Sequence, residues 1–316
     1  VTIPNGQTKA IYSDGAGSGG AMVDAFQDLS IPDLFIDDDL TVGDDLIVNG
    51  DIDLEGSIDV NGTANLDVVD IDVSLTVDGT VKLNGNFPTG TDNVALGNAA
   101  LSGGSLSGAG NIAIGDSVGS GITSGSNAVA IGRDALGGVY TGGDAIAIGR
   151  SALASLTSGN FNVVVGSLAG TALTTGSSNT AVGFEALKTE DAHGRNTAMG
   201  YQALKTLNAG AEAVTTTIGY LAGTSLTTGV QNTLIGGLSG DALTDADYNV
   251  AVGNNTLSAD TKGNRSVAIG YEALATQNFS TSTDTHNVAV GNVAGTAITT
   301  GIRNTLIGSG AGNALT

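Results

Sequence analysis

The feature that most constrains this sequence is a short unit, N-x-A-apolar-G, which recurs at nearly constant spacing from residue 93 onward. It reads N-V-A-L-G at Asn93–Gly97, N-I-A-I-G at Asn111–Gly115 and N-V-A-V-G at Asn249–Gly253. Its closing residue, here named the anchor glycine, occurs thirteen times, and successive anchors usually lie at positions i and i+17. A fixed period of this length predicts a solenoid, in which each repeat forms one coil and stacks on its neighbours. The anchor glycines are Gly97, Gly115, Gly132, Gly149, Gly166, Gly183, Gly200, Gly219, Gly236, Gly253, Gly270, Gly291 and Gly308.

The three residues before each anchor glycine predict a short β-strand. The residue directly before the anchor is aliphatic or Met in every copy, the residue two positions earlier is Val, Ile or Thr, and the one between is mostly Ala. Such alternation places the β-branched residues on one face and the small residue on the other. We expect the aliphatic column to form the core and the alanine column to let a neighbouring sheet approach closely. Ile235→Asp is then expected to unfold its part of the stack.

The second half of each coil predicts further turns. Two variable residues follow the anchor, then usually Ala, then Leu or Gly, and a T-T-G or T-S-G corner such as Thr174–Gly176. We therefore expect two short β segments and two glycine-marked corners in each coil. Nine of the thirteen copies place Asn four residues before the anchor. This Asn either adopts a left-handed backbone conformation or forms side-chain ladders along the stack.

The first 90 residues follow other patterns. Val1–Gly15 predicts a hairpin turned at Pro4-Asn5-Gly6, and Ala21–Leu29 a short helix. Residues 40–62 repeat every six residues, too short a unit to enclose a core unless three chains wind together. We divide the chain into an N-terminal attachment or capping segment (1–35), an acidic β-helical stem (36–90) and a β-roll (91–316) that continues or is capped beyond 316. The predicted fold is all-β, with a trimeric stem and a 13-coil roll of about 17 residues per coil, assembled as a homotrimer.

Composition restricts the partners and the chemistry. The formal net charge is −21, with no Lys or Arg between Lys9 and Lys82. Such a chain repels nucleic acid and anionic lipid. No apolar run is long enough for a membrane-spanning helix, so we expect no membrane insertion. The chain has no Cys and therefore no disulfides or thiolate sites.

No constellation of residues predicts catalysis, so we expect no enzyme, no cofactor and no metal. His193 and His286 lie in different coils, and we interpret both as surface histidines rather than as an axial metal site. Asp37–Asp39 with Asp44-Asp45 could bind a cation weakly, but the D-x-D-x-D-G calcium loop is missing, which favours solvated aspartates. The glycines of 103–110 lack G-K-[ST] and predict turns. Four aromatic residues directly follow an anchor and are expected to pack as a ladder: Phe184, Tyr201, Tyr220 and Tyr271.

Two coils carry surplus residues. The step from Gly200 to Gly219 has two, which we place within Asn208–Val214, and the step from Gly270 to Gly291 has four, which we place within Gln277–Thr285. Insertions in a solenoid form loops on its outer surface, often on its binding face. The longer loop is hydroxyl-rich around one aromatic residue, and its tip is our candidate receptor contact: Asn278, Phe279, Ser280, Thr281 and Ser282. Its alternative interpretation is a tolerated loop without a role.

The repeat N-x-A-[VI]-G-x-x-A-[LG] resembles the head repeats of trimeric autotransporter adhesins and, more closely, the repeats of phage tail fibres and related appendages. The opening T-I-P-N-G-Q-T-K-A-I-Y-S-D-G (Thr2–Gly15) is similar to tail-fibre segments that join fibre to virion. The resemblance implies three β-rolls in a homotrimer, a virion tail or baseplate partner at the N-terminal end, and a host glycan or protein at the distal end. It implies a virion appendage for host attachment. The alternatives are a bacterial surface adhesin fragment, located at the cell surface, and a depolymerase tailspike.

Overall fold

The computed structural model describes residues 11–13, 22–24, 47, 92–103 and 106–315. The chain divides into two compact units, Val1–Thr76 and Val77–Thr316. Every regular element within the described residues is a β-strand, which confirms the all-β prediction for this part of the chain.

In the first unit, β1 (Ile11–Ser13) pairs with β2 (Met22–Asp24) in antiparallel orientation. The helix predicted over Ala21–Leu29 is therefore wrong at Met22–Asp24, where pairing with β1 prevails over local helical propensity. The turn predicted at Pro4-Asn5-Gly6 lies outside the described residues. So does the predicted stem at 36–90, except for Ile47.

The second unit is a parallel β-solenoid with one three-residue strand in each coil, and each of these thirteen strands ends directly before an anchor glycine. This confirms the period, the thirteen copies and the predicted strand position. The strands are β3 (Val94–Leu96), β4 (Ile112–Ile114), β5 (Val129–Ile131), β6 (Ile146–Ile148), β7 (Val163–Val165), β8 (Thr180–Val182), β9 (Thr197–Met199), β10 (Thr216–Ile218), β11 (Thr233–Ile235), β12 (Val250–Val252), β14 (Val267–Ile269), β16 (Val288–Val290) and β17 (Thr305–Ile307).

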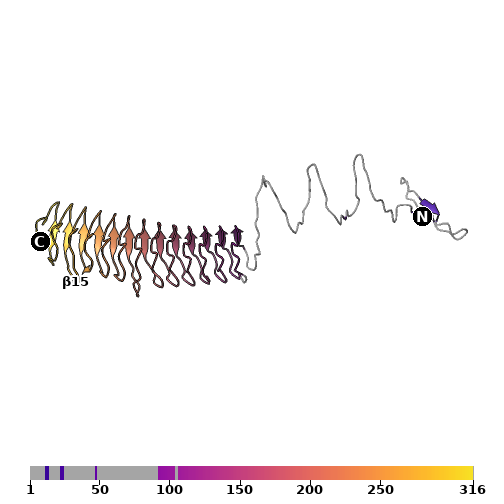
Figure 1. Cartoon of the computed structure of the whole chain (residues 1–316), viewed down its shortest axis with the longest axis horizontal. Coiled ribbons are helices and arrows are strands. Elements are labelled where there is room, and N and C mark those ends of the chain that lie inside the picture. The colour runs from indigo at the N-terminus through magenta and orange to yellow at the C-terminus, as the bar shows by residue number, and fades with distance from the viewer. Residues whose placement is uncertain (1–10, 14–21, 25–46, 48–91, 104–105, 316) are drawn as a thin grey trace, which may run out of the picture. The chain divides into compact units, whose positions relative to one another are not determined.

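The strands form a single sheet in chain order, β3 to β17, and all point the same way (Figure 1). Equivalent residues of successive coils pair directly, so Thr216 lies opposite Thr233 and Val267 opposite Val288. The extra residues of the longer coils do not shift this register, because they leave the stack before the next strand begins.

The expected second β segment of each coil is largely absent from the described coils. It occurs only as the two-residue pair β13 (Gly263–Asn264) with β15 (Thr283–Asp284), and as one bridge between Ser126 and Gly143. Left-handed residues at the second and fourth positions after the anchor, such as Asp134 (φ 58°) and Leu136 (φ 50°), interrupt extended backbone. The rest of each coil is consequently a succession of turns.

The prediction of which strand face is buried is wrong. The central, mostly alanine residue of each strand points inward and is fully buried from Ala113 to Ala289, whereas the two flanking columns face outward. Met199 is 39% exposed and Ile218 38% exposed. The interior is narrow and is filled by leucines from the turns, such as Leu136 and Leu153, which leaves room for only a small residue on the strand.

The anchor must be glycine because of its backbone conformation and because the next coil lies against it. All thirteen anchors have φ between 113° and 148°, a region that L side chains rarely adopt. A Cβ on Gly183 would also collide with the carbonyl of Gly200, the next anchor in the stack. The invariance of this glycine is thus a requirement of stacking.

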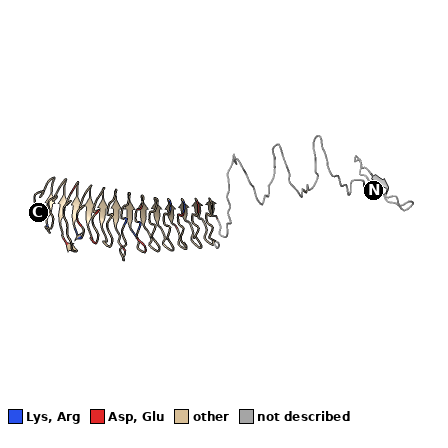
Figure 2. Cartoon of the chain, viewed as in Figure 1, with Lys and Arg blue, Asp and Glu red and all other residues tan. Residues whose placement is uncertain are grey.

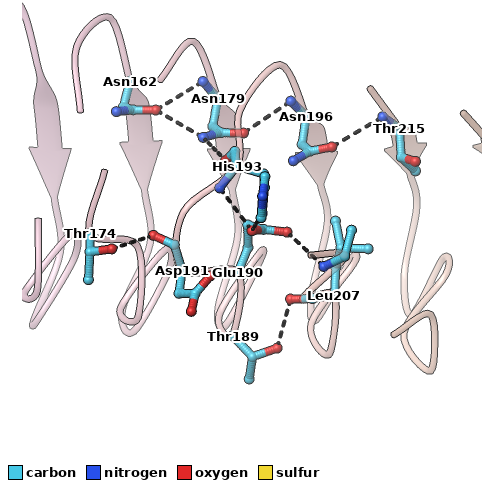
Figure 3. Close-up of polar contacts among 11 residues, drawn as sticks. Asn162, Thr174, Asn179, Thr189, Glu190, Asp191, His193, Asn196, Leu207 and Thr215 are labelled. Atoms are coloured by element: carbon cyan, nitrogen blue, oxygen red, sulfur yellow. Dashed lines mark hydrogen bonds and ion pairs between the residues drawn. The ribbon is translucent and has the colours of Figure 1, made fainter. Parts of the chain in front are cut away.

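The asparagines form the predicted side-chain ladder, and all of them except Asn304 are buried (Figure 3). Asn162 Oδ1 accepts the Asn179 N–H at 2.9 Å, and Asn179 Oδ1 accepts the Asn196 N–H at 3.0 Å. Asn162 Nδ2 donates to the Gly176 carbonyl, three residues before Asn179, at 2.8 Å. One side chain therefore satisfies two backbone groups of the following coil, which explains why Asn recurs here. The left-handed residue is instead the one before it, such as Phe161 (φ 57°).

Candidate functional site

The first insertion, within Asn208–Val214, forms an outward loop as predicted. Asn208 and residues 210–212 are exposed, and the loop extends beyond the neighbouring turns in Figure 1. Glu212, near its end, forms an ion pair with Arg195, which lies just before β9. The insertion has a local cost, because the buried Asn196 Nδ2 has no partner whereas the equivalent Asn162 Nδ2 binds the carbonyl of Gly176.

The second insertion, within Gln277–Thr285, contains the predicted contact residues. Asn278, Ser280, Thr281 and Ser282 are exposed, but Phe279 is only 8% exposed. Its ring is therefore not an exposed contact residue, and four polar side chains make the accessible tip. Sequence spacing placed the loop correctly but gave no information on the direction of the Phe279 side chain.

A buried polar network lies beneath this second loop. Asp260 Oδ2 accepts from Gln277 Nε2 at 2.6 Å, and Gln277 Oε1 accepts from Asn287 Nδ2 at 2.8 Å. Gln277 Nε2 also donates to Ser266 Oγ, which lies 2.6 Å from Thr285 Oγ1. All five side chains are fully buried and each has a partner, so the network replaces apolar packing without leaving these groups unsatisfied.

The carboxylate of Glu190 lies beneath the first loop (Figure 3). It is fully buried, and its Oε1 lies 3.1 Å from both the backbone N and the Nδ1 of His193. Asp191 completes a group of three possible metal ligands whose ligand atoms lie within 4.8 Å of one another. Because His193 and a loop amide already occupy the Glu190 oxygens, we interpret this group as structural.

The other predicted candidates are distributed differently. His286 is exposed and lies five residues before Gly291, far along the stack from His193. The Asp-rich segment at 37–45 lies outside the described residues. Among the described residues no helix is long and apolar enough to cross a membrane.

The predicted aromatic ladder exists for three of its four members. Phe184 and Tyr201 stack with ring centroids 5.4 Å apart, and Tyr201 and Tyr220 with centroids 5.5 Å apart. The three rings are exposed, so the ladder stabilises the surface of the roll rather than its core. Tyr271 is separate, because the two intervening coils carry Gly237 and Asn254 at this position.

A charged cluster adjoins the ladder and joins neighbouring coils. Glu185 Oε1 lies 2.6 Å from Lys188 Nζ, and Glu185 Oε2 lies 2.7 Å from Lys205 Nζ in the next coil. Gln202 Nε2 also donates to Glu185 at 2.8 Å. The hydrogen bonds from Lys188 and then Lys205 lower the pKa of Glu185 to about 2.

The fold and these side chains define the class of protein as a parallel β-solenoid with two outward loops. Comparison with known protein families, with curated proteins and with solved structures finds no match.

Proposed function

We propose that the chain is a structural and adhesive fibre protein, a phage tail fibre or related virion appendage that works as a homotrimer and attaches to a host surface. The observation that carries the proposal is the outer face of the thirteen-stranded sheet. Its two columns, the first and the last residue of every strand, consist entirely of Val, Ile, Leu, Met or Thr, in a chain of net charge −21. In Figure 2 the strands of this sheet are uniformly tan, and the colours of charged residues lie at the turns.

An uncharged ribbon of this length, with one column that is apolar throughout, favours a protein partner. Single exposed apolar residues are common, but a continuous apolar surface marks an interaction site. Strands are spaced at about 4.8 Å, so the twelve steps from β3 to β17 extend about 58 Å. Large exposed fractions recur along the ribbon, from Leu96 at 46% to Ile269 at 37%.

A second and third copy of the same chain fit this ribbon best. Another copy has the same strand spacing, so side chains can interdigitate in register over the whole length. Cyclic assembly also removes the apolar face from water in every copy. The number three follows from the resemblance of the repeat to trimeric fibres. The outward loops lie away from the strands and remain available to a receptor.

The test is the mass and the location of the protein. Light scattering of the purified full chain is expected to give three times the 30.9 kDa of one chain. Electron microscopy of intact particles with a label on the solenoid is expected to place it on the tail. A mass of one or two chains rejects the trimer. A label on bacterial cells without phage favours the adhesin, and shortening of host polysaccharide by the pure protein favours the tailspike.

A further inference from the structure

One buried column of the solenoid changes from apolar to acidic at two places. The seventh residue after the anchor is acidic in two coils, as Glu190 and Asp260, and both side chains are fully buried. A buried acid in an apolar column requires an explanation, because a carboxylate is costly to bury without donors. Seven other coils place a buried Leu or Ile at this position: Ile122, Leu156, Leu173, Leu207, Leu226, Leu243 and Ile298.

Each acid lies in the coil directly before a coil that carries extra residues. Glu190 belongs to the coil that starts at Gly183 and precedes the first insertion. Asp260 belongs to the coil that starts at Gly253 and precedes the second. No other described coil combines a buried acid at this position with a longer coil after it.

The acids accept the backbone N–H groups at which the loops leave the stack. In several regular coils the ninth residue after the anchor donates forward to the next coil, as from Ser158 to the carbonyl of Thr174 at 3.3 Å and from Thr228 to that of Thr244 at 3.2 Å. In the two long coils the N–H of the ninth residue donates instead to the buried acid of the preceding coil. Ala209 N–H donates to Glu190 Oε2 at 3.4 Å. Phe279 N–H donates to Asp260 Oδ1 at 3.1 Å.

A carboxylate suits this position because it only accepts hydrogen bonds and has room for several donors. Asp260 Oδ1 also accepts hydrogen bonds from the backbone N–H groups of Lys262 and Gly263, at 3.3 Å and 3.0 Å, while its Oδ2 accepts one from Gln277 Nε2. A leucine here would leave the departing N–H of the loop buried without a partner.

The far ends of the two loops share a second contact. Seven residues before the next anchor, where most coils have Gly, the loops have Glu212 and Asp284. Each pairs with an arginine five residues before the preceding anchor: Glu212 with Arg195, and Asp284 with Arg265 at 3.1 Å. Such exposed pairs contribute little free energy, but they fix the direction in which each loop returns.

We propose that Glu190 and Asp260 are positioning residues that hold the two loops as one preorganised contact surface. The loops leave the same part of the coil, four coils apart, which separates their bases by about 19 Å along the stack. Both lie on the side of the roll away from the strand arrows in Figure 1. The turns between them expose hydroxyl and carboxylate groups, such as Thr228 and Asp245, which are joined at 2.8 Å. The contact role rests on the proposed function, whereas the anchoring does not.

Amide hydrogen exchange of the full chain tests the anchoring. In the parent protein the Phe279 amide is expected to exchange slowly although it lies in an exposed loop, while the amides of Ser280 and Thr281 exchange fast. In Asp260→Leu, which restores the apolar column, exchange at Phe279 is expected to rise by about tenfold, with regular coils unchanged. Asp260→Asn keeps an acceptor oxygen and is expected to retain the protection.

A matched control moves the acid to a regular coil. Leu156→Glu places a carboxylate in the same column beneath the coil of Gly166, where the Thr175 N–H already donates to the carbonyl of Asp191. This variant is expected to melt well below the parent, because no free N–H meets the new acid. Fast exchange of Phe279 in the parent, or unchanged protection in Asp260→Leu, overturns the anchoring.

Host attachment separates the anchoring from the proposed function. If Asp260→Leu frees the Phe279 amide and weakens attachment while the mass stays that of the parent, both ideas are supported. If the amide is freed but attachment is unchanged, the anchoring stands and the contact role of this loop is rejected.

Discussion

At the scale of single residues, the width of the roll decides which side chains face inward. Ala251 is fully buried between Leu234 and Ala268, its partners in the neighbouring strands. Ile235 and Val252 flank this column on the outer face. The leucines of the turns fill most of the core, so only a small side chain such as Ala251 fits there on the strand. The larger strand side chains, such as Ile235 and Val252, cover the outer surface that we assign to self-assembly.

Two aspartate substitutions distinguish the two faces. Ala251→Asp places a charge among apolar side chains without a donor and is expected to unfold its part of the stack, at a cost of several kcal/mol. Ile235→Asp places the charge on the outer ribbon and is expected to reduce the mass to one chain while strand content persists. Circular dichroism and light scattering measure the two effects. Equal loss of strand signal in both variants would contradict this assignment of faces.

The asparagine ladder predicts a second residue-scale effect. Asn249→Ala removes the acceptor for the Ser266 N–H at 2.8 Å and the donor to the Gly263 carbonyl at 2.9 Å. Each buried group left without a partner costs about 1–3 kcal/mol, so thermal unfolding is expected at clearly lower temperature. The control is Asn278→Ala at the exposed loop, which is expected to unfold at the same temperature as the parent.

The acid dependence of stability should reflect Glu185. The pKa of Glu185 falls from 4.5 to about 2 on folding. Its contribution to the free energy of unfolding is therefore full above pH 4.5 and is lost as the pH falls towards 2. Glu185→Gln removes this titration. The stability difference between parent and variant is therefore expected to shrink between pH 5 and pH 2 in denaturant unfolding. A difference that stays constant over this range would show that the lysine contacts do not favour the charged form.

At the level of secondary structure, the sequence was sufficient to predict the coils but not to predict which face of each strand is buried. The regular period and the invariant glycines predict the strands, their register and the positions of both loops. The face assignment failed because both strand columns are apolar, and periodicity alone does not say which apolar column lies in the narrower space. The two buried acids were missed, although a signal exists in the sequence: an acid at a leucine position, one coil before a coil of unusual length.

One whole coil should be removable without changing the fold. Deletion of 237–253 joins Gly236 to Asn254 and removes one full period, so each remaining strand keeps its register. The free energy of unfolding is expected to fall only by the contribution of one coil and its interface with a neighbour, because repeats contact mainly their neighbours. Deletion of 238–253 falls short of the period by a single residue and leaves Gly237 as a surplus residue after the anchor. This control is expected to melt at a much lower temperature than the deletion of 237–253. Equal melting temperatures of the two deletions would contradict the stacking requirement.

At the scale of the whole molecule, the proposed roles separate by face. The outer ribbon of the sheet carries no charge and suits assembly, while the two loops and the turns between them are polar. A receptor can therefore contact the loops without competing with the interface between chains. The loops are also integrated into the stack through Asp260 and Glu190, so removing a whole loop disturbs more than its surface.

The attachment surface is best tested by changes confined to exposed atoms. Deleting Asn278–Ser282 would also remove the Phe279 amide that Asp260 accepts, so it mixes folding with binding. Ser280→Ala with Thr281→Ala changes two exposed side chains and leaves the hydrogen bonds of the Asn278 and Ser282 side chains intact. Thermal melting and mass are expected to match the parent, while attachment of the purified fibre to host cells falls by about tenfold, as expected when polar contacts of a receptor site are lost.

The matched control for this loop variant lies in two regular coils. Ser158→Ala with Thr175→Ala removes two exposed hydroxyl groups at the corresponding turns, where no residues are inserted, and is expected to leave attachment unchanged. A loss of attachment in the loop variant alone would assign the receptor contact to the tip of the second insertion. Equal attachment by the loop variant, the control and the parent would exclude this tip, because each pair removes the exposed hydroxyl groups of one serine and one threonine.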